Sequence, residues 1–187
     1  MTESRRDLLV KTAVDLFYRN GYHATGIDKI LTAAGVSKPT LYRHFNSKDD
    51  LIIAALESWD TQCRGWMKDE MQRRGDTPRA QLLALFDTLG DWFEEAGFQG
   101  CMFINATVEF AGQDNPIHAA ARRHKDLFAD YIRGIAAAAG ARDPAAVTEH
   151  LMILMEGAIV TAHTAGKSAA AQRAKTMAEA ILAQAID

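Results

Sequence analysis

Apolar residues recur every three or four positions along almost the whole chain, which is the spacing of one face of an α-helix. No segment alternates apolar and polar residues over several positions with enrichment in β-branched side chains, so no strand is predicted. The first helix is expected over residues 4–20, where Ser4 supplies a cap and Gly21 a stop. Its apolar stripe consists of Leu9, Ala13, Leu16 and Phe17. The pattern therefore predicts an all-α protein.

Two short helices are predicted after the first one. Thr25 is expected to cap the first of them, with Asp28 in the capping-box position. Ser37 is expected to cap the second, which has Pro39 in its first turn, where a missing N–H group does no harm. Gly35 suits the tight turn between the two helices.

Longer helices fill the rest of the chain. Ser47 is expected to cap a helix that reaches about residue 74. Five further helices are expected to begin near Thr77, Cys101, Asn115, Asp143 and Ser168. This gives nine helices, with a three-helix helix-turn-helix head over residues 1–48 and a six-helix body over residues 49–187. No flexible linker is expected between head and body, because the fourth helix continues directly from one into the other.

Residues 25–45 combine a short helix, a turn and a second short helix, which is a helix-turn-helix pattern. Leu41 and Phe45 are four residues apart and are expected to face inward, leaving the polar side chains outside. The second helix of such a motif enters the DNA major groove. Cationic, hydroxyl and aromatic polar side chains suit contacts with phosphates and base edges. The candidate DNA-binding residues are Thr25, Ser37, Lys38, Thr40, Tyr42, Arg43, His44 and Lys48. The alternative from the pattern alone is a packing unit with solvated polar residues.

The distribution of charge favours the DNA-binding alternative. The chain has 187 residues and a net charge of -3. Residues 1–48 carry eight basic and four acidic side chains, which is a net charge of +4, so the remainder carries -7. A basic head on an acidic body indicates an anionic partner for the head.

The stretch "TGIDKILTAAGVSKPTLYRHFNSKDDLI" resembles the DNA-binding signature of the TetR family of bacterial transcriptional regulators. The resemblance covers about residues 8–55 and begins in "AVDLFYRNGYHATGIDKI". It implies a homodimer with three N-terminal helices on double-stranded operator DNA and a body that holds a small-molecule inducer. It also implies that the last two helices form a four-helix interface with the partner. Most family members are repressors that a ligand releases from DNA.

Large apolar residues with a few polar ones mark a candidate ligand pocket in the body. These residues are Trp59, Cys63, Trp66, Trp92, Phe93, Cys101, Phe103, Asn105, Phe110, Met152, Met155 and His163. The alternative is a plain core, because aromatic residues and methionines at helical spacing are often core. The Asn105 amide either bonds to backbone or faces a ligand, since a buried amide needs partners.

Cys101 follows Gly100 at a predicted helix start, where the helix dipole stabilises a thiolate. The segment "GCMFINATVEF" resembles one found in a TetR subgroup that includes regulators answering reactive electrophiles. One hypothesis is therefore a thiol that senses electrophiles or oxidants, assisted by His163 if the two side chains meet. The alternative is an inert buried cysteine.

The final helices are rich in small and apolar residues, which permits close approach between helices. The candidate dimer-interface residues are Leu151, Leu154, Ile159, Met177, Ile181 and Leu182, some of them in the core and some at the interface.

Other classes of protein find little support in the sequence. The histidines lack metal-ligand spacing, and no catalytic or nucleotide-binding motif is present, so neither an enzyme nor a cofactor is expected. A helical enzyme that uses Cys101 with a histidine is the weakest alternative. Two cysteines and no apolar run near about 18 residues favour a reduced, cytoplasmic protein. The Arg5-Arg6 pair is not expected to belong to an export signal, because charged residues soon follow it.

Overall fold

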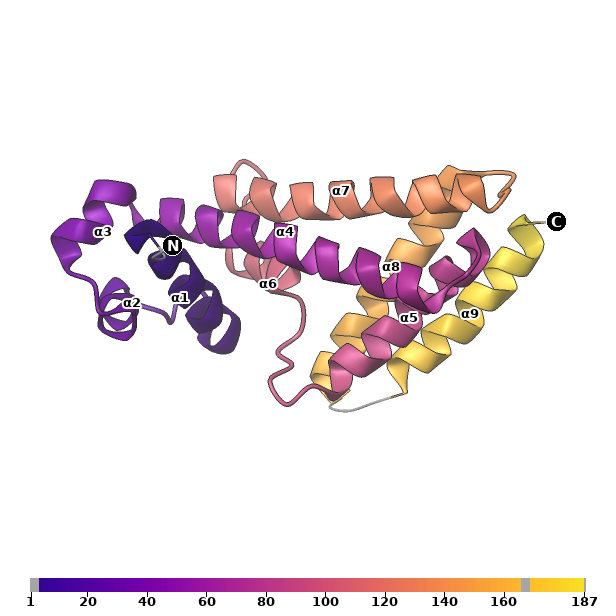
Figure 1. Ribbon diagram of the computed structural model, residues 1–187, viewed down its shortest axis with the longest axis horizontal. Coiled ribbons are helices and arrows are strands. Elements are labelled where there is room, and N and C mark those ends of the chain that lie inside the picture. The colour runs from indigo at the N-terminus through magenta and orange to yellow at the C-terminus, as the bar shows by residue number, and fades with distance from the viewer. Residues whose placement is uncertain (1–3, 166–168, 187) are drawn as a thin grey trace. The chain divides into compact units, whose positions relative to one another are not determined.

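The computed structural model of the protein describes residues 4–165 and 169–186. Within these ranges the chain forms nine α-helices and no strand, which confirms the predicted fold class (Figure 1). The helices are α1 (Arg5–Asn20), α2 (Ile27–Ala34), α3 (Lys38–His44), α4 (Lys48–Arg74), α5 (Pro78–Glu94), α6 (Met102–Glu109), α7 (Pro116–Ala138), α8 (Pro144–Ala165) and α9 (Ala170–Ala185). The predicted helix start at Ser168 lies outside the described residues.

Side-chain caps begin several helices where the sequence predicts them. Ser4 Oγ accepts a hydrogen bond from the Asp7 N–H at 3.1 Å. Ser47 Oγ accepts one from the Asp50 N–H at the start of α4. Each cap satisfies one of the N–H groups that lack a partner in the first turn of a helix. The predicted starts of α1 and α4 are therefore confirmed.

The helices group into two compact units. The head unit contains the described residues up to Gln62 together with Met102–His124. The body unit contains Cys63–Cys101 and the described residues from Lys125 onward. Helices α4 and α7 each contribute their first part to the head unit and their remainder to the body unit.

The core of the head unit forms where α1 packs against α2 and α3. Phe17 of α1, Ile30 of α2 and Leu41 of α3 are at most 2% exposed, and Phe45 is 4% exposed. Burial of each such side chain stabilises the fold by about 1.5–3 kcal/mol relative to exposure. The inward positions expected for α3 are therefore confirmed, and α3 is held by its apolar face.

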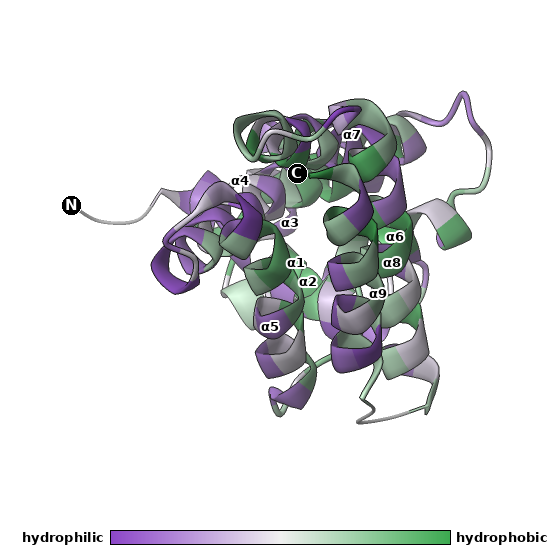
Figure 2. Cartoon of the chain, turned by 90° about the vertical axis from the view of Figure 1, so that its right-hand side faces the viewer, coloured by the Kyte–Doolittle hydropathy of each residue, from purple (hydrophilic) through white to green (hydrophobic). Residues whose placement is uncertain are grey.

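Helices α5, α8 and α9 pack together in the body unit. Each of these helices contains both hydrophobic and hydrophilic residues, green and purple in Figure 2. Lys175 of α9 lies 2.7 Å from the Asp87 carboxylate of α5. The buried apolar residues of these helices include Leu82, Leu85, Phe86, Leu89, Leu151, Met155, Ile159, Ala178 and Leu182.

Helix α8 is the one described helix that is long and apolar enough to cross a membrane by length and composition. No apolar run near 18 residues was expected from the sequence, and α8 departs from that expectation. The core helix of a soluble protein passes the same test, and 39% of the relevant window is buried inside the protein. The hydropathy of α8 alone is therefore weak support for a membrane span.

Candidate nucleic-acid interface

The turn between α2 and α3 has the geometry that a helix-turn-helix requires. Gly35 ends α2 with φ of 60° in the left-handed region, where a glycine carries no steric penalty. The Val36 N–H then donates to the carbonyl oxygen of Leu31 at 3.1 Å. Val36 itself is 9% exposed and packs under this joint. The turn fixes the direction in which α3 leaves α2.

Most of the predicted contact residues lie on the exposed face of α3. Lys38, Arg43 and His44 are exposed, and Tyr42 is 46% exposed, a large value for an aromatic side chain. Thr40 is half-buried. The motif therefore presents cations, hydroxyl groups and an imidazole on a short, firmly held helix.

Thr40 brings two other predicted residues together. Its Oγ1 lies 2.9 Å from Ser37 Oγ, and one guanidinium nitrogen of Arg43 donates to it at 3.1 Å. Ser37 is the N-cap residue of α3 by position, but its hydroxyl makes no capping bond to the backbone. The expectation of a Ser37 side-chain cap is thus wrong, because the Thr40 hydroxyl is its partner instead.

Thr25 does not have the role expected from the sequence. The N-cap residue of α2 is Gly26, and no side chain caps the helix, so the predicted Asp28 capping box is also absent. Thr25 is fully buried, and its hydroxyl donates to the carbonyl oxygens of Gly21 at 2.7 Å and Leu16 at 3.3 Å. A buried hydroxyl needs such partners. The side chain of Thr25 therefore closes the end of α1 and has no surface to offer a phosphate.

Lys48 is anchored to the loop between α1 and α2. It is half-buried, and its Nζ donates to the Tyr22 carbonyl oxygen at 2.6 Å. An ammonium group has three donors, so two remain for a phosphate. The predicted role of Lys48 in DNA binding is compatible with this anchor but stays a prediction.

The same loop is bound to α6 by a cluster that the sequence did not predict. The Tyr22 hydroxyl donates to the Met102 carbonyl oxygen at 2.9 Å. Glu109 accepts hydrogen bonds from the N–H groups of Tyr22 at 2.9 Å and His23 at 2.6 Å. His23 Nδ1 lies 2.7 Å from Glu109 Oε2 and carries the proton of that bond, because a carboxylate only accepts. We call Tyr22, His23 and Glu109 the loop clasp.

The loop clasp changes the electrostatics of its carboxylate. Burial of Glu109 by itself raises its pKa, but the donors from His23 and Tyr22 outweigh burial and leave the pKa below its usual value. Gly21 has a φ of 82°, which favours glycine, and a side chain there would also begin 2.9 Å from Glu109 Oε1. Residues 22 and 109 are far apart in the sequence, and no periodic or capping pattern relates them. The one available signal was a carboxylate at the end of the apolar stretch that forms α6.

Comparisons with known proteins fit this geometry. The family model described as "Bacterial regulatory proteins, tetR family" matches residues 9–55, which include the helix-turn-helix. The model described as "Tetracyclin repressor-like, C-terminal domain" matches residues 78–178, more than half of the chain. The chain belongs to the TetR family of bacterial transcriptional regulators. It is a DNA-binding transcriptional regulator.

Individual relatives show how far the TetR similarity extends. SCO4454, a TetR-family transcriptional regulator from Streptomyces coelicolor, is 31% identical with a TM-score of 0.89, over 98% of this chain and 96% of that chain. A TetR-type regulator from Streptomyces avermitilis is 27% identical with a TM-score of 0.87, over 98% of both chains. The HTH-type transcriptional activator FasR of Mycolicibacterium smegmatis is 36% identical over 92 residues, which are 49% of this chain and 42% of FasR.

The pocket residues predicted for this TetR-family chain fall into two groups. In the head unit, Phe103 stacks on His124 with ring centroids 3.6 Å apart, and Phe110 contacts the rings of the loop clasp. His124 Nδ1 lies 2.7 Å from Asp60 Oδ1, so a buried polar pair adjoins Phe103. Trp59 lies against Tyr18, with ring centroids 6.2 Å apart. Asn105 is half-buried.

The second group of predicted pocket residues lies in the body unit. Trp92 and Phe93 form an aromatic cluster with Phe98. The remaining members are Met155, which is buried, Cys63 and Met152, which are half-buried, and Trp66, which is 37% exposed. Two grooves of about 360 Å³ in this unit are lined by other residues. The predicted pocket stays a prediction.

The His163 ring lies beside Gly100, the residue that precedes Cys101. Cys101 is 8% exposed and directly precedes α6. A side chain on Gly100 would begin 2.8 Å from His163 Nδ1, so the imidazole lies against the backbone next to Cys101. The exposed His163 ring also meets the edge of Phe98. Burial of the thiol favours the inert alternative for Cys101.

The predicted dimer residues divide between core and surface. Leu151, Ile159 and Leu182 are at most 4% exposed and belong to the core of the protomer. Leu154 and Ile181 are half-buried, and Met177 is 56% exposed. The prediction did not include Ile153 and Val160 of α8, which are 69% and 45% exposed.

Proposed function

We infer that the protein is a homodimeric repressor that binds an inverted-repeat operator and leaves it when a small molecule binds the body. The observation that carries this proposal is the exposed polar face of α3, mounted on a buried apolar one. Tyr42 is 46% exposed and shares that surface with the exposed cations of Lys38 and Arg43. Operator DNA lies in the cytoplasm, where the protein would act.

The contacts around α3 suggest which residues bind phosphates and which bind base edges. Lys38 has no ion-pair partner within the described part of the chain and suits a phosphate. One N–H donor of the Arg43 guanidinium is bound to the Thr40 hydroxyl oxygen. The other donors of Arg43 remain for a guanine edge or a phosphate. The Tyr42 hydroxyl suits a phosphate oxygen. Substitution of Thr40 would therefore alter base preference as well as affinity, because it also frees Arg43.

The surface of α8 and α9 supports a homodimer. Ile153, Gly157 and Val160 recur at intervals of three and four residues, so they share one face of α8. All three are exposed, as is Met177 of α9. Large exposed apolar side chains on adjacent helices are typical of a surface that another chain covers. A two-fold dimer requires an operator of matching symmetry, with half-sites separated by about 34–36 Å.

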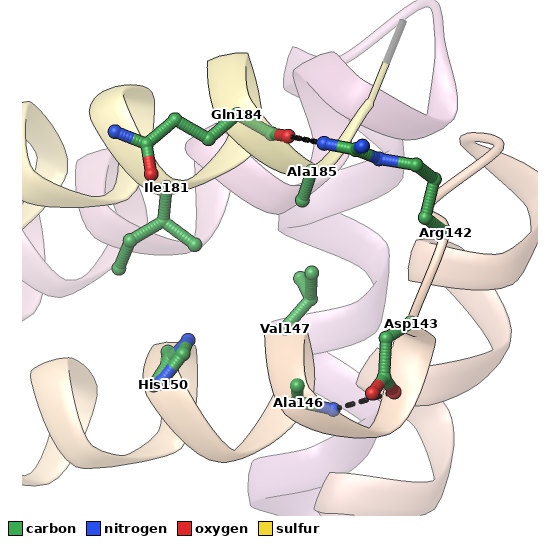
Figure 3. A pocket seen from close by; sticks show the side chains of 8 residues that line it. All are labelled: Arg142, Asp143, Ala146, Val147, His150, Ile181, Gln184 and Ala185. Atoms are coloured by element: carbon green, nitrogen blue, oxygen red, sulfur yellow. Dashed lines mark hydrogen bonds between the residues drawn. The ribbon is translucent and has the colours of Figure 1, made fainter.

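One of the grooves in the body unit borders this face. It lies between the first turns of α8 and the end of α9 and is lined by Arg142, Asp143, Ala146, Val147, His150, Ile181, Gln184 and Ala185 (Figure 3). The Arg142 guanidinium closes one end by donating to the Gln184 carbonyl oxygen (Figure 3). The half-buried Ile181 of the predicted interface forms part of its wall.

Helix α4 and the loop clasp both hold the loop that precedes α2. Lys48, the first residue of α4, is bound to the loop through Tyr22. Both ends of α6 are bound to the same loop, through Met102 and Glu109. A ligand that moves α4 or α6 would therefore displace the loop that precedes α2. Because ligand and DNA act through one equilibrium, operator DNA must weaken ligand binding by the same factor.

The proposed function is tested in two steps. Fragments that bind the protein are first selected from random DNA, and compounds are then screened for release of the selected fragment. The expected outcome is an inverted repeat whose transcription the protein lowers in a reporter assay. Affinity should fall steeply between about 50 and 200 mM salt, because several phosphates are contacted. Failure to enrich any sequence would contradict the operator, and stimulated transcription would contradict the repressor.

A further inference from the structure

Arg6, in the first turn of α1, lies beside the end of the proposed recognition helix. Its guanidinium carbon is 5.3 Å from the centroid of the Phe45 ring. Phe45 is the C-cap residue of α3 and is 4% exposed, so the ring is itself firmly held. Helices α1 and α3 also pack against each other. The contact therefore places a cation of α1 next to the C-terminal end of α3.

The contact with Phe45 leaves the hydrogen-bonding capacity of Arg6 unused. An aromatic ring attracts the guanidinium as a whole, whereas the five N–H donors need separate acceptors. No carboxylate pairs with Arg6 among the described residues. The adjacent Asp7 accepts a hydrogen bond from the Ser4 hydroxyl at 2.7 Å. Arg6 is thus positioned without being neutralised by a carboxylate of the described residues.

Other cations near α3 are already engaged in part. Arg43 donates to Thr40, and Lys48 donates to the Tyr22 carbonyl oxygen. Arg5, next to Arg6, is exposed and has no partner within the described residues. An unpaired and pre-positioned guanidinium beside a DNA-reading helix has the geometry that suits bidentate binding of a phosphate.

We propose that Arg6 binds a backbone phosphate of the operator next to the segment of major groove that α3 enters, and that Phe45 positions it there. Arg5, which has no partner among residues 4–165 and 169–186, adds a second charge to the same turn of α1. The inference rests on the proposed function, since it requires that α3 face DNA. It extends the predicted contact surface from the helix-turn-helix to the start of α1.

The test measures operator affinity by fluorescence anisotropy at several salt concentrations, with the duplex selected as described above. Arg6→Met keeps an apolar stem over Phe45 and removes the charge and donors, while Arg6→Lys keeps the charge. Arg79→Ala is the control, because it removes one exposed, unpaired charge from α5, outside the helix-turn-helix. The thermal midpoint of each variant, followed by circular dichroism, shows whether it is folded.

Arg6→Met should reduce the slope of log affinity against log salt by about 1.8, the contribution of two phosphates, one for each protomer of the dimer. Its loss of affinity between 50 and 200 mM salt would then be about 12-fold smaller than that of the wild type. The loss of affinity at low salt should be equal on operator and random DNA, and Arg6→Lys should retain the wild-type slope. An unchanged slope in folded Arg6→Met would overturn the inference, as would an equal change in Arg79→Ala. Absence of salt-dependent binding by the wild type would instead overturn the proposed function.

Discussion

Replacement of Glu109 by glutamine tests whether the loop clasp holds the head unit together. Oε1 accepts from the Tyr22 N–H, and Oε2 accepts from the N–H and the ring of His23. A glutamine offers one oxygen and an NH2 group that cannot accept. At least one backbone N–H of the loop therefore loses its acceptor and meets a donor instead.

The structure allows the size of this effect to be estimated. A hydrogen bond to a charged group contributes about 1.5–3 kcal/mol to stability. The Glu109 side chain is 25% exposed and that of His23 is 65% exposed, so water replaces part of the loss. We expect Glu109→Gln to lower the free energy of unfolding by about 2 kcal/mol. For a protein of this size, that corresponds to a fall of about 4–8 °C in Tm.

Thermal unfolding followed by circular dichroism measures the effect, with Glu57→Gln as the matched control. Glu57 is an exposed glutamate of α4 whose side chain has no partner within the described residues, so its variant should keep the wild-type Tm within about 1–2 °C. The pKa of Glu109 is lowered in the folded protein, so its stabilisation is present above the usual glutamate pKa. It is lost as the pH falls through the lowered pKa. The difference between wild type and Glu109→Gln should therefore narrow in acid.

Equal Tm values for Glu109→Gln and Glu57→Gln at neutral pH would refute this reasoning. A Tm difference between wild type and Glu109→Gln that stayed constant as the pH fell would refute the role of the ionised carboxylate. In the first case the short distances to Tyr22 and His23 would reflect proximity without a stabilising contribution.

Three further predictions concern the body unit. Ile153→Asp should convert the dimer to monomers in sedimentation velocity. The protomer should stay folded, because Ile153 is 69% exposed in it. A dimer that persists would place the interface elsewhere. Cys101 should resist maleimide in the native protein and react after denaturation, because it is 8% exposed; rapid native labelling, traced to Cys101 by peptide mapping, would revive the sensing hypothesis. Hydrogen bonds from Arg73 and Arg74 lower the pKa of Glu70 to about 2, so the stability that Glu70→Gln removes is present above about pH 4.5 and is lost towards pH 2. A Tm difference between wild type and Glu70→Gln that persists at pH 2 would contradict that assignment.

The fold was predictable from the sequence because its signals are local. Ser4, Ser47 and Thr77 each cap a helix through a residue three positions away. Apolar spacing likewise placed Leu41 and Phe45 inside, since a helix turns by a fixed angle at each residue. These features depend on neighbours in the chain and require no knowledge of the tertiary structure.

Thr25 shows where local reasoning gave the wrong answer. A threonine before a short helix resembles an N-cap, but the same hydroxyl can bond backwards to the end of the preceding helix. In this chain the Thr25 hydroxyl bonds backwards, to the carbonyl oxygens of Gly21 and Leu16. Helix α2 begins two residues later than Thr25. The two alternatives differ only in which backbone groups the tertiary packing buries.

The loop clasp shows what local reasoning could not find. Glu109 meets Tyr22 and His23 across more than 80 residues of chain. The same limit applies to the cation of Arg6 over the ring of Phe45, which joins the first turn of one helix to the end of another. Such contacts depend on how helices pack and leave no periodic signal in the sequence.

Footprinting of the selected operator tests the central claim most directly, because it reports where the protein lies on DNA. Two protected half-sites centred about 10–10.5 base pairs apart, or a multiple of that spacing, are expected from two copies of α3. Protection should disappear in a folded Tyr42→Ala, Arg43→Ala double variant. A single protected block without two-fold symmetry, or protection that survives in the double variant, would contradict the account.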